Sequence, residues 1–196
     1  MNRTVALVLA VDPGVGFPGS KYLEEVGRKR LIEVVVDEAR TWPVDDVVVV
    51  LGADGEQIAA KADLGDALLV LDLDSSQGLA ASLRIGLDTL ARDRHVERAV
   101  LAYGDQPGVE PDVVTALVAK QAEPGCLAAV PRYRYARGWP IVIGRDLWVR
   151  FLGLEGDIDV LDVLGSHPEG VEEVWFDRLA DPRIRDADDL PHRPRR

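Results

Sequence analysis

The sequence predicts an α/β fold of three layers, in which helices cover both faces of a mostly parallel central sheet. Continuous apolar runs, such as VALVLAV at residues 5–11 and VVVVL at residues 47–51, alternate with amphipathic stretches. Strands that are apolar on both faces are typical of parallel sheets covered on both sides. Their alternation with helices gives the order βαβαβαβαβ, which is the pattern of a three-layer α/β/α domain.

Each apolar run and each amphipathic stretch predicts one element. Leucines at helical spacing line one side of the stretch 78–92, and a proline stands in the first turn of the stretch 111–121. The expected strands cover residues 5–11, 47–51, 67–73, 99–103 and 127–130. The expected helices cover residues 23–42, 55–62, 78–92 and 111–121.

The regular alternation of apolar runs and amphipathic stretches ends after residue 131. We expect a shorter, appended meander there that closes the fold, with strands at 141–143 and 171–176 and helices at 146–151 and 158–164. Residues 1–190 are expected to form one domain. Residues 191–196, in which prolines alternate with basic residues, are expected to form a flexible tail.

The charge balance limits the partners. The chain has 196 residues with 23 Lys and Arg against 34 Asp and Glu, a formal net charge of −11. Such a surface repels nucleic-acid backbones, so we expect no DNA or RNA partner. A nucleotide ligand is still compatible, because a pocket can be locally positive or can recruit Mg²⁺. No apolar run reaches the roughly 18–20 residues that cross a bilayer, so we expect no membrane partner.

The chain contains one cysteine, Cys126. An internal disulfide and a Cys-based zinc site are therefore excluded, which fits a reducing cytoplasm. Cys126 lies in the apolar stretch CLAAV and is expected in the core. The four tryptophans could lie in the core or at an interface, and the core is the simpler interpretation. They are Trp42, Trp139, Trp148 and Trp175.

Ligand-like residues follow three of the expected strands, and ligands of parallel sheets bind at the carboxyl ends of strands. The first strand leads into a glycine-rich loop, DPGVGFPGSK, in which Gly14 lets backbone N–H groups approach a phosphate and Lys21 adds a positive charge. The loop matches neither GxGxxG nor GxxxxGK[ST]. A plain Pro/Gly turn is therefore the alternative.

Two further strand ends carry polar residues. Asp72 stands at the end of the third strand, and Gly78 and Ser82 stand in the first turns of the next helix. Gly104 and Asp105 follow the fourth strand, and one carboxylate together with substrate phosphates is a common way to hold Mg²⁺. Asp105 could instead cap the following turn.

Two later motifs bring a cation and a carboxylate. Arg137 stands in RGWP and Asp157 in EGD, and Asp157 could alternatively cap the helix that follows it. The histidines show no metal-ligand spacing, and no Ser-His-Asp or Cys-His arrangement can be argued. Ser75 and Ser76 have no base partner in the sequence pattern.

These motifs together resemble those of the MobA-like nucleotidyltransferases, in particular the molybdenum-cofactor cytidylyltransferase branch. The family's LAAGxGxRxGxxK aligns with LAVDPGVGFPGSK at residues 9–21, and its GMxxSLRxGL with GLAASLRIGL at residues 78–87. Its GDQP is present at residues 104–107, its RGHP appears as RGWP at 137–140, and a later GD falls at 156–157. Its closing DIDTPEDL corresponds to RIRDADDL at residues 183–190.

The resemblance implies a Rossmann-like fold of the nucleotide-diphospho-sugar-transferase type. It also implies transfer of a nucleotide, CMP from CTP, onto a phosphorylated acceptor such as the molybdopterin cofactor. In that reaction a phosphate oxygen of the acceptor attacks the α-phosphate and pyrophosphate leaves.

The resemblance also assigns roles to residues. Lys21 and Asp105 are the catalytic pair: Lys21 neutralises the phosphates of the nucleoside triphosphate, and Asp105 holds Mg²⁺ together with Asp157. Ser82 would contact the nucleotide through its hydroxyl group. The full set of expected nucleotide-binding residues is Gly14, Lys21, Asp72, Gly78, Ser82, Gly104 and Arg137.

The chain departs from the family pattern in the phosphate loop. Asp12 replaces a glycine, Gly16 replaces an arginine, Pro18 replaces another glycine, and RIR replaces the closing DID. Two unit charges about 4 Å apart interact by roughly 4 kcal/mol at an effective dielectric near 20, so an Asp12 carboxylate would oppose a triphosphate strongly. The alternative function is therefore a member without transfer activity that acts as a binding or maturation partner for a molybdenum enzyme.

Overall fold

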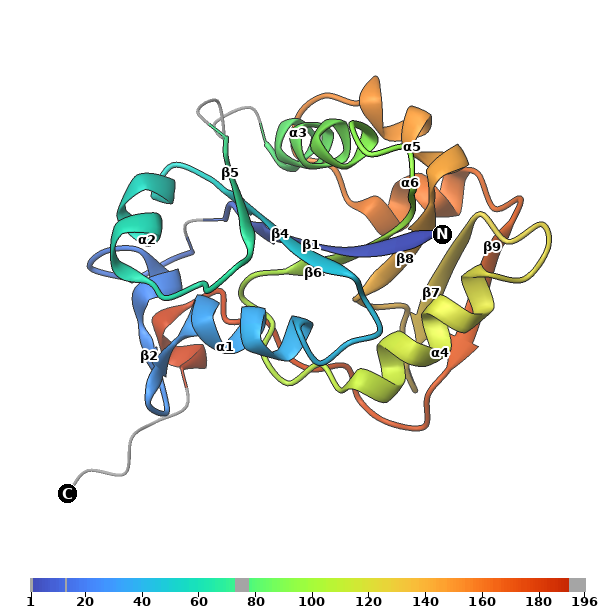
Figure 1. Cartoon of the computed structure of the whole chain (residues 1–196). Helices are drawn as coiled ribbons and strands as arrows, with labels where there is room; N and C mark the ends of the chain where they lie inside the picture. Colours follow the sequence, from blue (N-terminus) through green and yellow to red (C-terminus); the bar gives the residue numbers. More distant parts are fainter. Residues whose placement is uncertain (1, 13, 73–77, 191–196) are drawn as a thin grey trace.

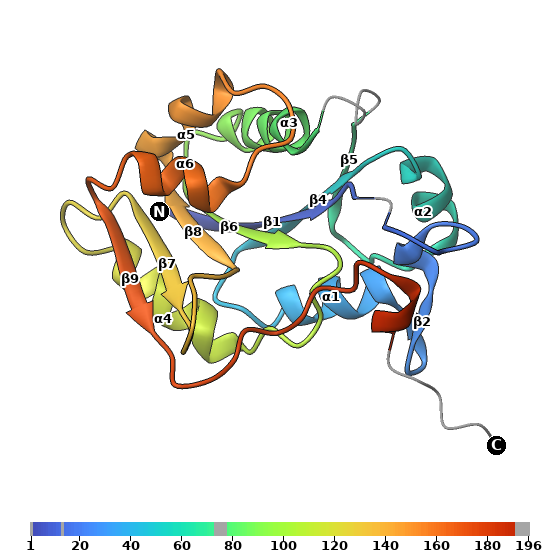
Figure 2. The same cartoon turned by 180° about the vertical axis from the view of Figure 1, so that it is seen from behind.

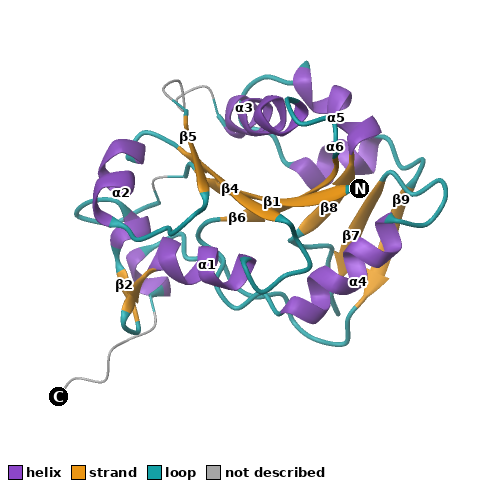
Figure 3. Cartoon of the chain, viewed as in Figure 1, coloured by secondary structure: helices purple, strands orange, loops and turns teal. Residues whose placement is uncertain are grey.

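The computed structural model of the chain describes residues 2–12, 14–72 and 78–190. A seven-stranded sheet with the order β5-β4-β1-β6-β8-β7-β9 forms the middle layer, and helices lie on both of its faces (Figures 1 and 3). Within this sheet, the strand pairs are parallel except the two that β8 makes with β6 and β7. The expected three-layer, mostly parallel α/β fold is therefore confirmed.

The described elements follow the predicted order closely. The strands of the main sheet are β1 (Arg3–Ala10), β4 (Asp46–Leu51), β5 (Leu68–Leu71), β6 (Val96–Tyr103), β7 (Ala128–Arg132), β8 (Ile141–Gly144) and β9 (Val171–Trp175). The α-helices are α1 (Leu31–Ala39), α2 (Gly55–Lys61), α3 (Leu79–Ala91), α4 (Pro111–Gln121), α5 (Arg145–Leu152) and α6 (Val160–Ser166).

Each face of the sheet has its own apolar core. Because side chains alternate along a strand, Val8 of β1 belongs to the core beneath α1, α2 and α4, while Leu7 belongs to the core beneath α3, α5 and α6. The two groups of helices lie on opposite sides of the sheet in both views (Figures 1 and 2). Cys126 is buried in the first core, as expected.

The sequence prediction was wrong for the first helix. A helix was expected over residues 23–42, but α1 is shorter, and a 3-10 turn, η1 (Lys21–Leu23), and a hairpin of β2 (Glu25–Val26) and β3 (Lys29–Arg30) precede it. Gly27 at the hairpin turn has a φ of +69°, a conformation that interrupts a helix. Leu23 of η1 and Val26 of β2 pack against the first core, so their spacing fits a helical period although neither residue lies in an α-helix.

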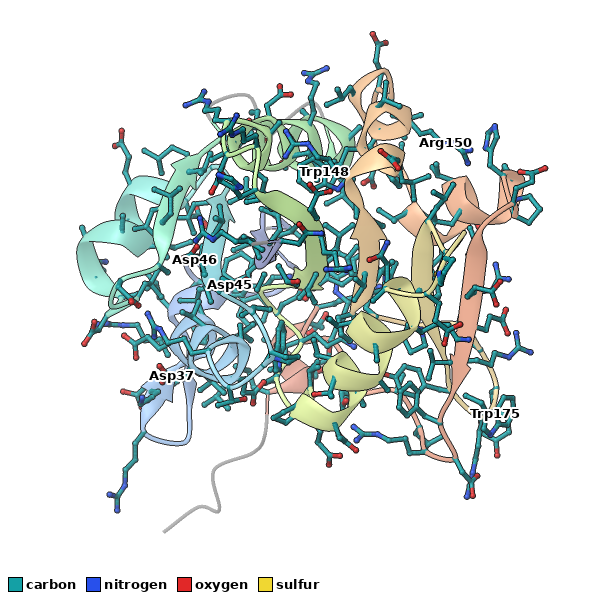
Figure 4. The ribbon with its side chains drawn as sticks, turned by 45° about the vertical axis from the view of Figure 1, so that its right-hand side comes forward. Asp37, Asp45, Asp46, Trp148, Arg150 and Trp175 are labelled. Atoms are coloured by element: carbon teal, nitrogen blue, oxygen red, sulfur yellow. The ribbon has the colours of Figure 1, made fainter. Side chains whose placement is uncertain are left out.

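The region after residue 131 is part of the main sheet and not an appended meander. β8 inserts antiparallel between β6 and β7, and β9 pairs parallel with β7 at the sheet edge. Trp175, labelled in Figure 4, lies on this edge strand and is 62% exposed, so the expected core position is wrong for this tryptophan. Trp42, Trp139 and Trp148 are buried.

A long segment after β9 returns across the molecule to the loop that follows β1 (Figure 2). The Val15 N–H donates to the Arg185 carbonyl at 2.9 Å, and a short 3-10 helix, η3 (Ala187–Asp189), follows. The segment around Arg185 and Ala187 therefore lies against the N-terminal glycine-rich loop. The expected flexible tail, residues 191–196, lies outside the described residues, as do Ser75 and Ser76.

Within residues 2–12, 14–72 and 78–190, none of the helices has the length and apolarity that crossing a membrane requires.

Candidate active site

A pocket of about 740 Å³ opens at the carboxyl ends of β1 and β6. The start of α3, the loop before α6 and the returning C-terminal segment complete its wall. The lining residues are Leu9, Val11, Asp12, Gly78, Leu79, Tyr103, Asp157, Ile158, Asp159, Asp162, Arg183 and Arg185. The pocket therefore lies where ligands of parallel sheets bind.

Four charged side chains form one network at the inner end of this pocket. We call Asp12, Lys21, Asp105 and Arg183 the charge tetrad. The Lys21 Nζ donates to Asp105 Oδ2 at 2.6 Å and lies 3.1 Å from Asp12 Oδ2. Arg183 donates from Nε to Asp105 Oδ1 at 2.7 Å and from Nη2 to Asp105 Oδ2 at 2.8 Å. Its Nη2 also donates to Asp12 Oδ2 at 3.3 Å.

Burial makes this network tightly coupled. The side chains of Lys21 and Asp105 are both 0% exposed, so each charge depends on the other for compensation. Burial opposes ionisation of Asp12, but the hydrogen bond from the Gly14 N–H and the charges of Lys21 and Arg183 outweigh it and lower the pKa of Asp12. Burial likewise opposes the charge of Arg183, and its bonds to Asp105 overcome this effect and raise its pKa. The ionised forms of Asp12 and Arg183 are therefore favoured in the folded chain.

The returning C-terminal segment fixes Arg183 in place. The Ile184 N–H donates to the Asp105 carbonyl at 2.7 Å, and the Ile184 side chain is buried in the core. The Arg183 guanidinium lies over the Tyr103 ring, 3.6 Å from its centroid, and the Trp139 ring lies 4.0 Å from Tyr103 on centroids. A cation stacked on an aromatic face in this way is stabilised by the ring quadrupole.

The glycine-rich loop is folded onto Asp12. Gly14 has a φ of +73°, and its N–H donates to Asp12 Oδ1 at 2.9 Å. A Cβ at Gly14 would lie 2.8 Å from Lys21 Cδ, so only glycine fits beside the lysine stem. One N–H that could cradle a phosphate is thus already bonded to Asp12, and the Val15 N–H is bonded to Arg185.

Gly78 brings the start of α3 against the loop before α6. A Cβ there would lie 2.5 Å from the carbonyl carbon of Gly156, and the Ala80 N–H donates to the Gly156 carbonyl at 3.1 Å. This contact places Asp157 at the pocket wall, where it is exposed. The cap of α6 is Asp159, whose Oδ1 accepts the Leu161 N–H at 2.8 Å, so Asp157 does not have the alternative role of helix cap.

Asp72 and Ser82 form a buried pair beneath the pocket. Ser82 is 0% exposed and Asp72 is 1% exposed, and the Ser82 Oγ donates to Asp72 Oδ2 at 2.5 Å. Neither residue lines the pocket. Gly104 allows close packing of the strand ends, because a Cβ there would lie 2.9 Å from that of Ala10.

Arg137 is not brought to the pocket. Its Nε donates to Glu173 Oε1 of β9 at 2.6 Å, on the half of the sheet that carries β7 and β9. Direct nucleotide binding by Arg137, Asp72 or Ser82 stays a prediction from the resemblance, and the geometry gives it no support.

The residues around Asp105 do not fit a divalent cation as they are arranged. Mg²⁺ binds carboxylate oxygens at about 2.0–2.1 Å and requires near-octahedral geometry. Both oxygens of Asp105 already accept from Arg183, and one also accepts from Lys21. Among the residues that the structure describes, no three metal-ligating side chains are grouped as a site. The Mg²⁺ role of Asp105 and Asp157 therefore stays a prediction.

Sequence reasoning missed the residues that complete this site. Arg183 was noted for its departure from the family pattern, but its contact with Asp105 was not foreseen. Tyr103, Asp159 and Asp162 were also missed, although Tyr103 stands at the end of an expected strand. The signal that could have found Arg183 is a cation at a position where the related motif has an aspartate.

The fold and pocket define a three-layer α/β protein with a pocket at the carboxyl ends of its parallel strands, and comparison with known proteins identifies the family. Residues 6–171 match the family model of the MobA-like NTP transferase domain. The chain belongs to this family. A curated relative, the bifunctional protein GlmU of Sinorhizobium medicae, is 28% identical over 132 residues, which are 65% of this chain. The match spans only 27% of that longer protein.

Solved structures agree with this assignment. The homologue of Mycobacterium tuberculosis Rv0371c from Mycobacterium sp. strain JC1 is 27% identical with a TM-score of 0.85, over 96% of this chain and 94% of that chain. Rv0371c in complex with manganese, from M. tuberculosis H37Rv, is 23% identical with a TM-score of 0.83, over 96% of each chain. Molybdopterin-guanine dinucleotide biosynthesis protein A from Archaeoglobus fulgidus has a TM-score of 0.67 at 20% identity, over 95% and 94%. The last two likenesses show a shared fold.

Proposed function

We propose that this chain is a nucleotidyltransferase that binds a nucleoside triphosphate in the pocket and transfers its nucleotide to a phosphorylated acceptor. CTP as donor and the molybdopterin cofactor as acceptor are the substrates that the sequence motifs favour. The observation that carries the proposal is the pocket of about 740 Å³ at the carboxyl ends of β1 and β6, in a member of the MobA-like family.

The proposed reaction needs positioning and charge rather than a covalent intermediate. An oxygen of the acceptor phosphate forms a bond to the α-phosphorus of the triphosphate. The bond from that phosphorus to the bridging oxygen of the β-phosphate breaks, and pyrophosphate carries away the electron pair. Arg183 and Arg185 line the pocket and supply positive charge toward the phosphates. Lys21 is buried and does not line the pocket, and its charge compensates the buried Asp105 carboxylate.

A second candidate function is supported by a specific observation. The pocket wall has four carboxylates, Asp12, Asp157, Asp159 and Asp162, against two arginines. In addition, Asp12 accepts the Gly14 N–H that a phosphate would otherwise use. These features favour a member that has lost transfer activity and acts as a binding or maturation partner for a molybdenum enzyme.

Pyrophosphate release separates the two candidates. The purified chain would be given CTP, GTP or ATP in turn, with and without a molybdopterin acceptor, and nucleotide binding would be measured in parallel by calorimetry. Release that requires one nucleotide and the acceptor supports transfer. Binding without release supports the second candidate. If the chain neither binds a nucleotide nor releases pyrophosphate, the proposed function is contradicted.

A further inference from the structure

We propose that the guanidinium of Arg183 takes the place of a divalent cation at Asp105, so that the protein meets the phosphates of its nucleotide with a resident cation and not with a metal ion. The identity of the ligand as a nucleotide rests on the proposed function. The absence of a metal requirement at Asp105 rests on the charge tetrad alone.

Both oxygens of the Asp105 carboxylate are already occupied by hydrogen bonds. This carboxylate is fully buried and accepts three hydrogen bonds from two cations, at 2.6 Å from Lys21 and at 2.7 and 2.8 Å from Arg183. A metal ion at either oxygen would have to share that oxygen with the guanidinium. It would also add two positive charges beside two that are already present, and close like charges repel strongly where water is scarce.

The fold fixes Arg183 in place. Its backbone neighbour Ile184 donates to the Asp105 carbonyl, and Gln106 Nε2 donates to the Asp181 carbonyl at 2.7 Å. The segment that carries Arg183 therefore runs beside the turn that carries Asp105. The stack on Tyr103 holds the guanidinium plane from one side. These contacts distinguish Arg183 from a long surface side chain that could swing away freely.

Arg183 is accessible to a ligand in the pocket. Lys21 is 0% exposed, whereas the Arg183 side chain is 16% exposed and lines the pocket. Its Nε and Nη2 are bonded to the tetrad, while Nη1 has no hydrogen-bond partner in the part of the chain that the structure describes. Of the two cations in the tetrad, Arg183 is thus the one that can donate to a phosphate. An arginine with one edge on a carboxylate and a free N–H is suited to bind an anion.

Direct metal binding tests the first half of the proposal without any nucleotide. Mn²⁺ would be titrated into the wild-type chain and followed by electron paramagnetic resonance. We expect the wild type to bind no Mn²⁺ at Asp105. Arg183→Asp would place a third carboxylate beside Asp12 and Asp105, so this variant is expected to gain Mn²⁺ affinity by about tenfold or more. Arg185→Asp, with the same charge change but no contact with Asp105, is the matched control.

Two results of the Mn²⁺ titration would overturn the proposal. Wild-type Mn²⁺ binding at micromolar concentration that Asp105→Asn abolishes would overturn it, and this result does not depend on whether Arg183→Asp folds. A gain in Arg183→Asp no larger than that in Arg185→Asp would also overturn it, provided that both variants keep the wild-type circular dichroism spectrum.

Nucleotide titration tests the second half. Calorimetry with CTP, GTP and ATP would compare buffer containing Mg²⁺ with buffer containing EDTA. Affinities that agree within about threefold support metal-independent binding. Binding in Mg²⁺ alone would overturn the inference and leave the proposed function intact. No binding in either buffer would instead contradict the proposed function, while the Mn²⁺ experiment would still decide the role of Arg183.

Discussion

Arg183 binds Asp105 at both carboxylate oxygens, across 78 positions of sequence. The pair joins the end of β6 to the segment that returns after β9. Together with Lys21 and Asp12 it forms a tetrad of two cations and two anions at the inner end of the pocket. The charges at the inner end of the pocket therefore come from side chains of the protein itself.

Lys21 is expected to be essential for stability. Lys21→Met would leave the buried Asp105 carboxylate with Arg183 as its only remaining cation in the tetrad. Removing one partner of a buried ion pair costs about 3–5 kcal/mol, and the retained Arg183 places the expected loss at the lower end, about 3 kcal/mol. Lys29→Met removes an exposed pair with Asp37 and is the control, for which we expect little change. Urea unfolding measures both, and equal losses would argue against a special role of Lys21.

Asp12 is expected to weaken nucleotide binding. Asp12→Asn keeps an oxygen for the Gly14 N–H but removes a negative charge from the pocket wall. Because Asp12 is 42% exposed, solvent reduces the effect, and we expect about tenfold tighter binding, or about 1.4 kcal/mol. Asp88→Asn, on the exposed side of α3, is the control for net charge. Calorimetry would contradict the electrostatic account if Asp12→Asn bound nucleotide no better than Asp88→Asn.

The stabilising effect of Asp12 is expected to depend on pH. The pKa of Asp12 is lowered in the folded chain, so its ionised form is favoured by folding. Its contribution is then fully present above the unfolded pKa of about 3.9 and is lost as the pH falls through the lower folded pKa. The stability difference between wild type and Asp12→Asn should be constant near neutral pH and should shrink in acid. Urea unfolding at several pH values checks this, and a difference that grows in acid would have the wrong sign.

Gly78 is expected to tolerate no side chain. It has a φ of +88°, and a Cβ would meet the backbone of Gly156 at 2.5 Å. Gly78→Ala should therefore cost about 2–3 kcal/mol and displace the loop that carries Asp157. Gly153→Ala is the matched control, because a Cβ there meets nothing within 4 Å and its φ of −96° suits any residue. Thermal unfolding that ranks the two variants equally would count against the close contact.

The sequence was sufficient to predict most of the fold. The helix over 111–121 was predicted with the same bounds as α4, because one apolar stripe and one proline define it. The hairpin before α1 was missed because its apolar residues also fit a helical period. In the site, the loop, Lys21 and Asp105 were found from local motifs. The contact between Asp105 and Arg183 was not, because no local pattern records a pairing of residues so far apart in the chain.

Local motifs also did not reveal the tertiary partners of Ser82 and Arg137. Both residues fit family motifs in the sequence, but the fold directs Ser82 to Asp72 and Arg137 to Glu173. A motif gives the chemistry that a residue could perform, and the tertiary partner decides whether that group is still available.

The most direct test of the account is a crystal structure of the chain soaked with CTP and Mn²⁺, with anomalous scattering used to locate the metal. We expect Arg183 to remain on both oxygens of Asp105, with no anomalous peak at that carboxylate and with the nucleotide phosphates beside Arg183. An anomalous peak within about 2.2 Å of an Asp105 oxygen, with Arg183 displaced toward solvent, would contradict the account.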